Sequence, residues 1–139
     1  MAIHYKDIEM AFDFVSSGRP GECEAYLNIH TGKTHIHSQY VDIEEALPED
    51  IDDETKYISL PHKNDLDLGK ELALNFAYQY LPDEAEKIED IFKKKGAYSR
   101  FKSILEAKDA VEKWYEYEKN EEERVLREWC ELNEIKLSD

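Results

Sequence analysis

The chain has 139 residues, of which 41% are hydrophobic and 12% aromatic, so it should form one folded domain over residues 1–139. Its formal net charge of −15 argues against general DNA binding and favours a partner with a basic surface. No stretch approaches the ~20 apolar residues of a membrane span and no signal-peptide run is visible, so a cytoplasmic protein is expected.

The first elements are expected to be a helix and a hairpin. Residues 5–17 have apolar side chains at helical spacing, and Gly18 follows as a stop signal. Residues 22–39 alternate as two strands around a two-residue turn at Thr31-Gly32, which places Ile29 opposite Thr34. One face then carries Cys23, Ala25, Leu27, Ile29 and Ile36, and the other carries Tyr26, Asn28, His30, Lys33, His35 and His37. The first face is the expected core side, which makes Cys23 a buried thiol.

An acidic stretch separates the hairpin from a third strand. Residues 42–54 hold eight acids and no base, so most of this stretch should be an exposed loop, with a short helical turn at residues 43–47. Residues 56–60 suggest a strand with Ile58 and Leu60 inward, ended by Pro61. The three strands predict a small antiparallel sheet.

Helical spacing continues from residue 66 onward. Residues 68–81 predict one helix, a second is expected between Asp83 and Gly96, and a third between Gly96 and Asp109. Asp83 and Asp109 each precede a glutamate by three residues, which is the pattern of a helix N-cap followed by an acidic N3 residue.

The final segment predicts one long helix. Trp114, Val125 and Trp129 fall on one stripe, since the eleven residues from Trp114 to Val125 make about three turns. Asn120 and the glutamates after it leave a new helix start open. The predicted fold class is therefore α+β: about three antiparallel strands, packed with an N-terminal helix and a C-terminal set of three to four helices ending in a long one.

Three segments carry a family resemblance. "AYLNIHTGK" (25–33), "GAYSRFKSIL" (96–105) and "WYEYEKNEEERVLREWCELNEI" (114–135) occur in this order. Their order and spacing resemble the bacterial uncharacterised protein family 0158. The resemblance implies a small soluble bacterial α+β protein without an established activity, so it supplies no functional residues. Tyr98, Tyr117 and Cys130 differ from the family pattern in ways that are mild for packing.

The hairpin histidines are the metal candidate. His35 and His37 lie two apart on one strand, so both face the same side, and His30 can join them across the hairpin. Three imidazoles are a common ligand set for catalytic zinc. No HExxH pattern or fourth acidic ligand accompanies them, and a polar outer sheet face explains all three residues equally well.

A basic island interrupts the acidic sequence at residues 93–102. Lys93, Lys94 and Lys95 are expected at the end of one helix, with Arg100 and Lys102 in the first turn of the next. The island can neutralise helix ends and nearby acids, or it can bind an anion or RNA with Tyr98 as a stacking surface. The structural role is the favoured interpretation, because the wider basic surface that tracks phosphates is missing.

No set of residues predicts catalysis. Cys23 is expected to point inward and Cys130 lies in an acidic helix, so neither thiol has the electropositive surroundings of a nucleophile, and both should be reduced. No cofactor is implied. We therefore favour a non-catalytic interaction or regulatory module that meets a partner at residues 42–54 or at the sheet edge. A metal-dependent or nucleotide-handling enzyme using the histidines, an anion or RNA binder using the basic island, and a homodimer remain alternatives.

Overall fold

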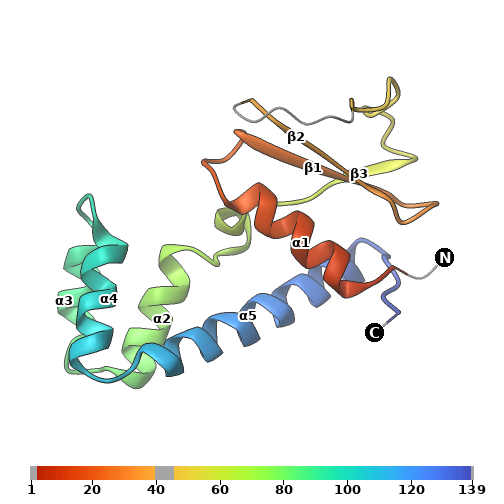
Figure 1. The fold of residues 1–139 in the computed structure, drawn as a ribbon. Helices are drawn as coiled ribbons and strands as arrows, with labels where there is room; N and C mark the ends of the chain where they lie inside the picture. The colour runs from red at the N-terminus through yellow and green to blue at the C-terminus, as the bar shows by residue number, and fades with distance from the viewer. Residues whose placement is uncertain (1–2, 40–45, 139) are drawn as a thin grey trace. The chain divides into compact units, whose positions relative to one another are not determined.

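The computed structural model describes residues 3–39 and 46–138 and confirms the α+β class. The sheet has three strands, and Figure 1 shows it together with the α-helices. Their bounds are α1 Tyr5–Ser16, β1 Cys23–Asn28, β2 Thr34–Ser38, β3 Tyr57–Ser59, the 3₁₀ helix η1 Lys63–Leu66, α2 Lys70–Tyr80, α3 Ala85–Ile91, α4 Ala97–Ala107 and α5 Val111–Leu132.

The chain divides into two compact units. Unit 1 comprises Met1–Leu66 and Glu123–Asp139, and unit 2 comprises Asp67–Glu122. Helix α5 begins in unit 2 and ends in unit 1, so the predicted long helix is continuous through Asn120. Folding as a single domain stays a prediction. Within residues 3–39 and 46–138, no helix combines the length and apolar character needed to cross a bilayer.

The sheet of unit 1 has the order β2-β1-β3, and both pairings are antiparallel. The predicted two-residue turn is wrong: Leu27, not Ile29, lies opposite Thr34, and residues 29–32 form the loop. The Asn28 side chain explains the longer loop, because its Oδ1 accepts hydrogen bonds from the backbone N–H groups of His30 and Thr31. The register moves by two residues, so the predicted faces of the β1 and β2 residues are kept.

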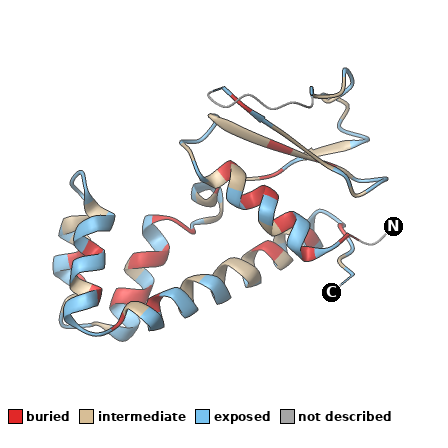
Figure 2. Ribbon diagram, in the orientation of Figure 1, coloured by how far each residue is buried: buried red, intermediate tan, exposed pale blue. Residues whose placement is uncertain are grey.

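The core of unit 1 lies between α1 and the inner sheet face. Ala25 and Leu27 alternate with half-buried residues along β1, as predicted. Figure 2 shows the buried stripe of α1, which consists of Tyr5, Ile8, Ala11, Phe12 and Val15. The prediction that Cys23 is buried is wrong: it is half-buried at the sheet end, with Sγ 3.8 Å from Ser38 Oγ.

Aromatic rings fill the core of unit 2. The Trp114 ring of α5 lies 5.3 Å from Phe76 of α2 and 5.0 Å from Phe101 of α4, with both pairs close to edge-on. Tyr117 adds a contact to Phe76 at 5.3 Å. Such pairs contribute ~0.5–1.5 kcal/mol beyond the area that they bury.

The helix ends differ from the predicted caps. Glu84, not Asp83, precedes α3, and its side chain makes no capping hydrogen bond. Asp109 has φ +53° and closes the C-terminus of α4, because its N–H donates to the Glu106 carbonyl and Ala110 N–H donates to the Leu105 carbonyl. Glu134, at φ +58°, closes α5 with the same hydrogen-bond pattern.

The buried residues of α5 also differ from the predicted stripe. Trp114 is buried in unit 2, as its position in the stripe predicts. In unit 1 the fully buried side chains of α5 are Leu126 and Cys130, whereas Val125 and Trp129 are half-buried. Burial raises the pKa of the Cys130 thiol to about 11, and the Arg127 charge opposes this only in part.

Candidate functional site

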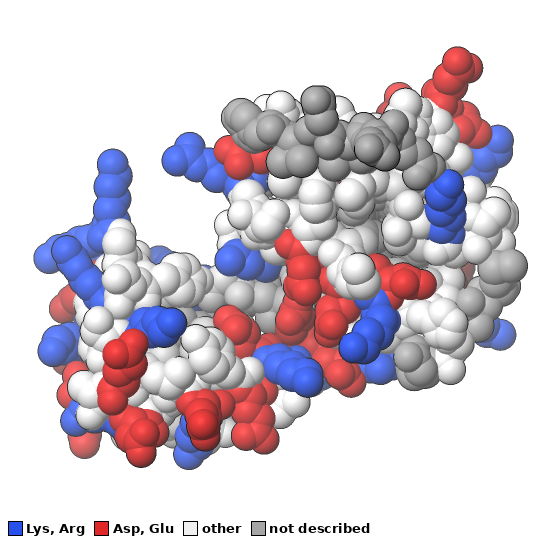
Figure 3. Space-filling model, in the orientation of Figure 1, with Lys and Arg blue, Asp and Glu red and all other residues white. Residues whose placement is uncertain are grey.

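The basic island lies at the surface of unit 2. All five of its cationic side chains are exposed, and Figure 3 shows basic side chains at the α3–α4 end of this unit. The sequence predicts Lys93–Lys95 at the end of a helix, and this is wrong. Helix α3 ends at Ile91, so the three lysines lie in the turn before α4. The nearest ion pair is local, between Lys93 Nζ and Asp90 Oδ1 at 3.5 Å. The island as an anion site stays a hypothesis.

The predicted histidine face is present, but its members have separate surroundings. His35 lies opposite Tyr26, with its ring 5.9 Å from the Tyr57 ring, and His37 lies opposite Glu24. His30 lies in the hairpin loop, where its Nε2 is 3.1 Å from the Thr55 carbonyl oxygen. Among the described residues, no group of three His, Cys, Asp or Glu side chains is arranged to hold a metal ion. Zinc at His30, His35 and His37 stays a hypothesis.

A buried histidine was missed by the sequence reasoning. His62, only 4% exposed, lines a cavity of about 270 Å³ together with Cys23. Its Nε2 lies 2.8 Å from the Gly18 carbonyl, and its Nδ1 accepts a hydrogen bond from Asn64 N–H. Both ring nitrogens are therefore engaged with the backbone, so this imidazole is not placed to act as a base toward Cys23. The sequence signal for it was its place directly after Leu60 and Pro61, the end of the predicted third strand.

A large cavity in unit 1 runs along β3. Its volume is about 580 Å³, and one strand contributes residues of both faces to it. Since Tyr57 and Ser59 point to one side of the sheet and Ile58 to the other, this hollow follows the edge of the strand. We call it the β3 groove, defined by Tyr26, Ile29, Ile51, Asp52, Glu54, Tyr57, Ile58, Ser59 and Asn133.

Acidic side chains border the β3 groove. The Tyr26 hydroxyl donates a hydrogen bond to Glu24 Oε2. Burial, this hydrogen bond and the negative charges of Glu24 and Asp52 together raise the pKa of Tyr26 to about 12. Asp52 and Glu54 are exposed, and neither forms an ion pair with another described residue. The groove therefore offers uncompensated negative charge beside an apolar surface.

The loop before β3 is held by its own hydrogen bonds. Asp53 Oδ1 accepts from the backbone and the hydroxyl of Thr55, at 2.9 and 2.6 Å. Lys56 Nζ lies 2.8 Å from Asp50 Oδ2, and the Tyr57 hydroxyl donates to Asp50 Oδ1. These contacts set the position of the groove acids Asp52 and Glu54. The beginning of the predicted acidic loop, residues 42–45, lies outside the described residues.

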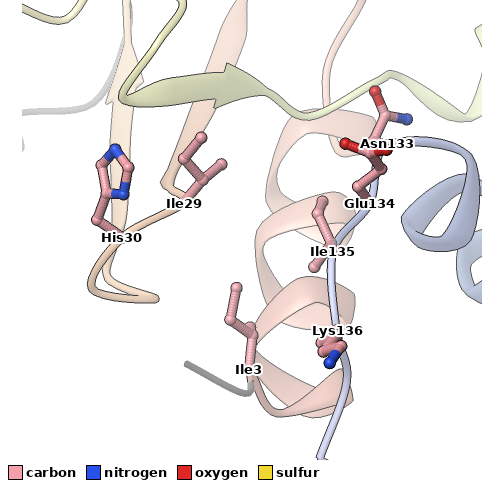
Figure 4. Close-up of a pocket in the computed structure, with 7 residues that line it drawn as sticks. All are labelled: Ile3, Ile29, His30, Asn133, Glu134, Ile135 and Lys136. Carbon is pink, nitrogen blue, oxygen red and sulfur yellow. The ribbon is translucent and has the colours of Figure 1, made fainter.

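A second cavity, of about 320 Å³, adjoins the β3 groove. Figure 4 shows its lining side chains, of which Ile29 and Asn133 also line the groove. Ile3 and Ile135 complete its apolar part, and Ile3 N–H donates to the Lys136 carbonyl at 2.9 Å. The apolar surface therefore extends from β3 past the hairpin loop toward the paired terminal segments.

Comparison with known proteins identifies a protein family and no individual relative. A model of an uncharacterised protein family, UPF0158, matches residues 12–138. No curated protein matches the chain significantly. No solved structure matches it significantly either. The family description carries no activity, so the interpretation of the site depends on the geometry of this chain.

Proposed function

The chain belongs to the uncharacterised protein family UPF0158, whose model matches residues 12–138, and we propose its function from the geometry of the β3 groove, because the family description names no activity. The protein is a non-catalytic interaction module that binds a basic segment of another protein in this groove. The observation that carries the proposal is the combination of an open, partly apolar cavity with two acids that have no described ion-pair partner.

The physical basis is complementarity of charge and surface. A net charge of −15 attracts basic partners over a Debye length of ~8 Å at physiological salt and repels acidic ones. Asp52 and Glu54 then select cations at the groove, while Ile29, 39% exposed, offers apolar contact. Charge sets the association rate and the choice of partner, and burial of the apolar side chains slows dissociation.

Selection from a random peptide display library at low salt tests the proposal. The enriched peptides should combine Lys or Arg with a large apolar residue, and their binding should weaken as salt rises. The variant Asp52→Asn/Glu54→Gln should lose this binding. The control Asp83→Asn/Glu86→Gln removes the same charge from exposed positions of unit 2 and should keep it. Equal loss in both variants would show that total charge, and not the groove, attracts the peptides.

A further inference from the structure

The outer edge of β3 presents peptide groups for hydrogen bonding. Leu60 N–H donates to the Ala25 carbonyl, and Ile29 N–H donates to the Lys56 carbonyl, both at 2.9 Å. In an antiparallel ladder bonded and non-bonded pairs alternate, so Lys56, Ile58 and Leu60 direct their N–H and C=O groups toward β1 and the residues between them direct theirs away from it. The backbone N–H and C=O groups of Ser59 and Tyr57 therefore point toward the outer edge of the sheet. No strand in the described part of the chain pairs with that edge.

Both ends of this edge are closed. At one end, Tyr57 N–H donates to the Asp53 carbonyl at 3.0 Å and cannot bind a partner. At the other end, Pro61 has no N–H. Between these two ends lie the Tyr57 C=O, the Ser59 N–H and the Ser59 C=O. None of these three groups makes a hydrogen bond to a described residue. An added strand can thus form three hydrogen bonds, in one register.

On the basis of the proposed function, we infer that the basic partner binds as an antiparallel strand added to β3. Its first contact residue exchanges two hydrogen bonds with Ser59, and the residue two further along donates its N–H to the Tyr57 carbonyl. The β3 groove along this edge then accommodates the partner's side chains. Main-chain hydrogen bonds of this kind give affinity, and the alternate side chains give specificity.

The faces of the sheet specify the partner's residues. Side chains opposite Ser59 and Tyr57 lie on the Tyr26 side of the sheet, where Asp52 and Glu24 are close to the Tyr26 hydroxyl, so cations fit there. The side chain opposite Ile58 lies on the other side, near Ile29, so an apolar residue fits there. The preferred core is basic–apolar–basic, for example Lys-Val-Lys, since a β-branched residue also favours the extended chain.

Backbone N-methylation of a Lys-Val-Lys peptide with neutral flanks distinguishes strand addition from charge attraction. Methylation at the first Lys removes the N–H that would meet the Ser59 carbonyl, and binding should weaken about tenfold or more. Methylation at Val is the matched control, because that N–H points away from β3, and affinity should stay within about twofold. The Ser59 amide should exchange with solvent more slowly when the unmodified peptide is bound.

Each outcome decides between the two proposals. Equal weakening by both methyl groups, or no change in Ser59 exchange with peptide bound, overturns strand addition. The groove function survives that result if the Asp52→Asn/Glu54→Gln variant still loses the peptide. Absence of Lys-Val-Lys binding at millimolar concentration also overturns strand addition, while enriched basic peptides of another pattern in the display selection keep the groove function.

Discussion

The two units of this chain differ in charge and in what fills their cores. Unit 1 carries nineteen acidic and eight basic side chains, whereas unit 2 carries fourteen and ten. The core of unit 1 is mainly aliphatic and includes the buried polar side chains of Ser38 and His62, while rings form the centre of unit 2. Most of the excess negative charge therefore lies in unit 1, which contains the β3 groove. Unit 2 has a smaller excess of acidic side chains and a core of packed aromatic rings.

The largest expected effect comes from the aromatic core of unit 2. Trp114→Ala should lower the free energy of unfolding by ~3–5 kcal/mol, because a buried ring with several ring neighbours leaves a cavity. Urea denaturation measures the loss, and the neighbouring Tyr115→Ala, which removes a 49% exposed ring, should change stability by only ~0.5 kcal/mol.

The same variant tests whether the two units unfold together. Because α5 is one unbroken helix that contributes to both units, β1 amides should lose protection from hydrogen exchange together with α4 amides. If protection falls in α4 while β1 is unchanged, the units are separate folding domains and the single-domain prediction is wrong.

The two thiols of unit 1 should differ strongly in reactivity. A pKa raised from about 9 to about 11 leaves Cys130 with about a hundredfold less thiolate at pH 8, and the side chain is only 1% exposed. A maleimide reagent should therefore modify half-buried Cys23 in the folded protein and Cys130 only after unfolding. Mass spectrometry of the two peptides measures this, and rapid modification of Cys130 in the folded state would contradict its burial.

A moderate gain in stability is expected at the matching helix ends of the two units. Asp109 in unit 2 and Glu134 in unit 1 hold positive φ angles that glycine adopts without a clash of Cβ. Each substitution to glycine should raise stability by ~0.5–1 kcal/mol in thermal melts. Substitution to alanine keeps the Cβ and is the control at each site. A glycine variant less stable than its alanine counterpart would show that the closing carboxylate side chains stabilise these ends.

The smallest expected effect is a pH dependence at the loop before β3. The hydrogen bond from Lys56, more than that from Tyr57, lowers the pKa of the exposed Asp50. In the unfolded chain this carboxyl protonates near its ordinary pKa of ~3.9. Its contribution to stability is therefore complete above that pH and is lost as the pH falls through the lower value of the folded state. NMR titration of the Asp50 carboxyl measures this, and Lys56→Met should return its pKa toward the ordinary value. An unchanged titration in Lys56→Met would show that Lys56 is not the cause.

Helices and strands whose apolar side chains recur at regular intervals were predictable from the sequence. The helix at residues 5–17, the alternating faces of the hairpin and the continuity of α5 were predicted, since each depends on local periodicity. The hairpin register was not, because the Asn28 side chain lengthens the loop and Ile29 N–H donates to the distant Lys56 carbonyl.

The buried residues of α5 show why the prediction of one buried stripe with Trp114, Val125 and Trp129 was wrong. At 3.6 residues per turn, Leu126 lies ~120° around the helix from Trp114. The helix thus buries one face in unit 2 and another in unit 1, which no extrapolation along one stripe can predict. The candidate site has the same difficulty: the exposed sheet edge was expected, but the groove also needs Asn133, more than seventy residues after β3.

The discontinuity of unit 1 has a consequence for synthesis on the ribosome. Ile3 N–H donates to the Lys136 carbonyl and Ser138 N–H donates to the Ile3 carbonyl, so the backbone of the first described residue is bound by a segment that is translated more than 130 residues later. At ~5–20 residues per second, the part of the sheet unit that ends at Leu66 waits on the order of 4 to 15 seconds until residue 139 has been added. The contiguous helical unit is translated completely before them, so its folding can precede that of the sheet unit, and the nascent sheet edge is exposed meanwhile to chaperones and to other nascent strands.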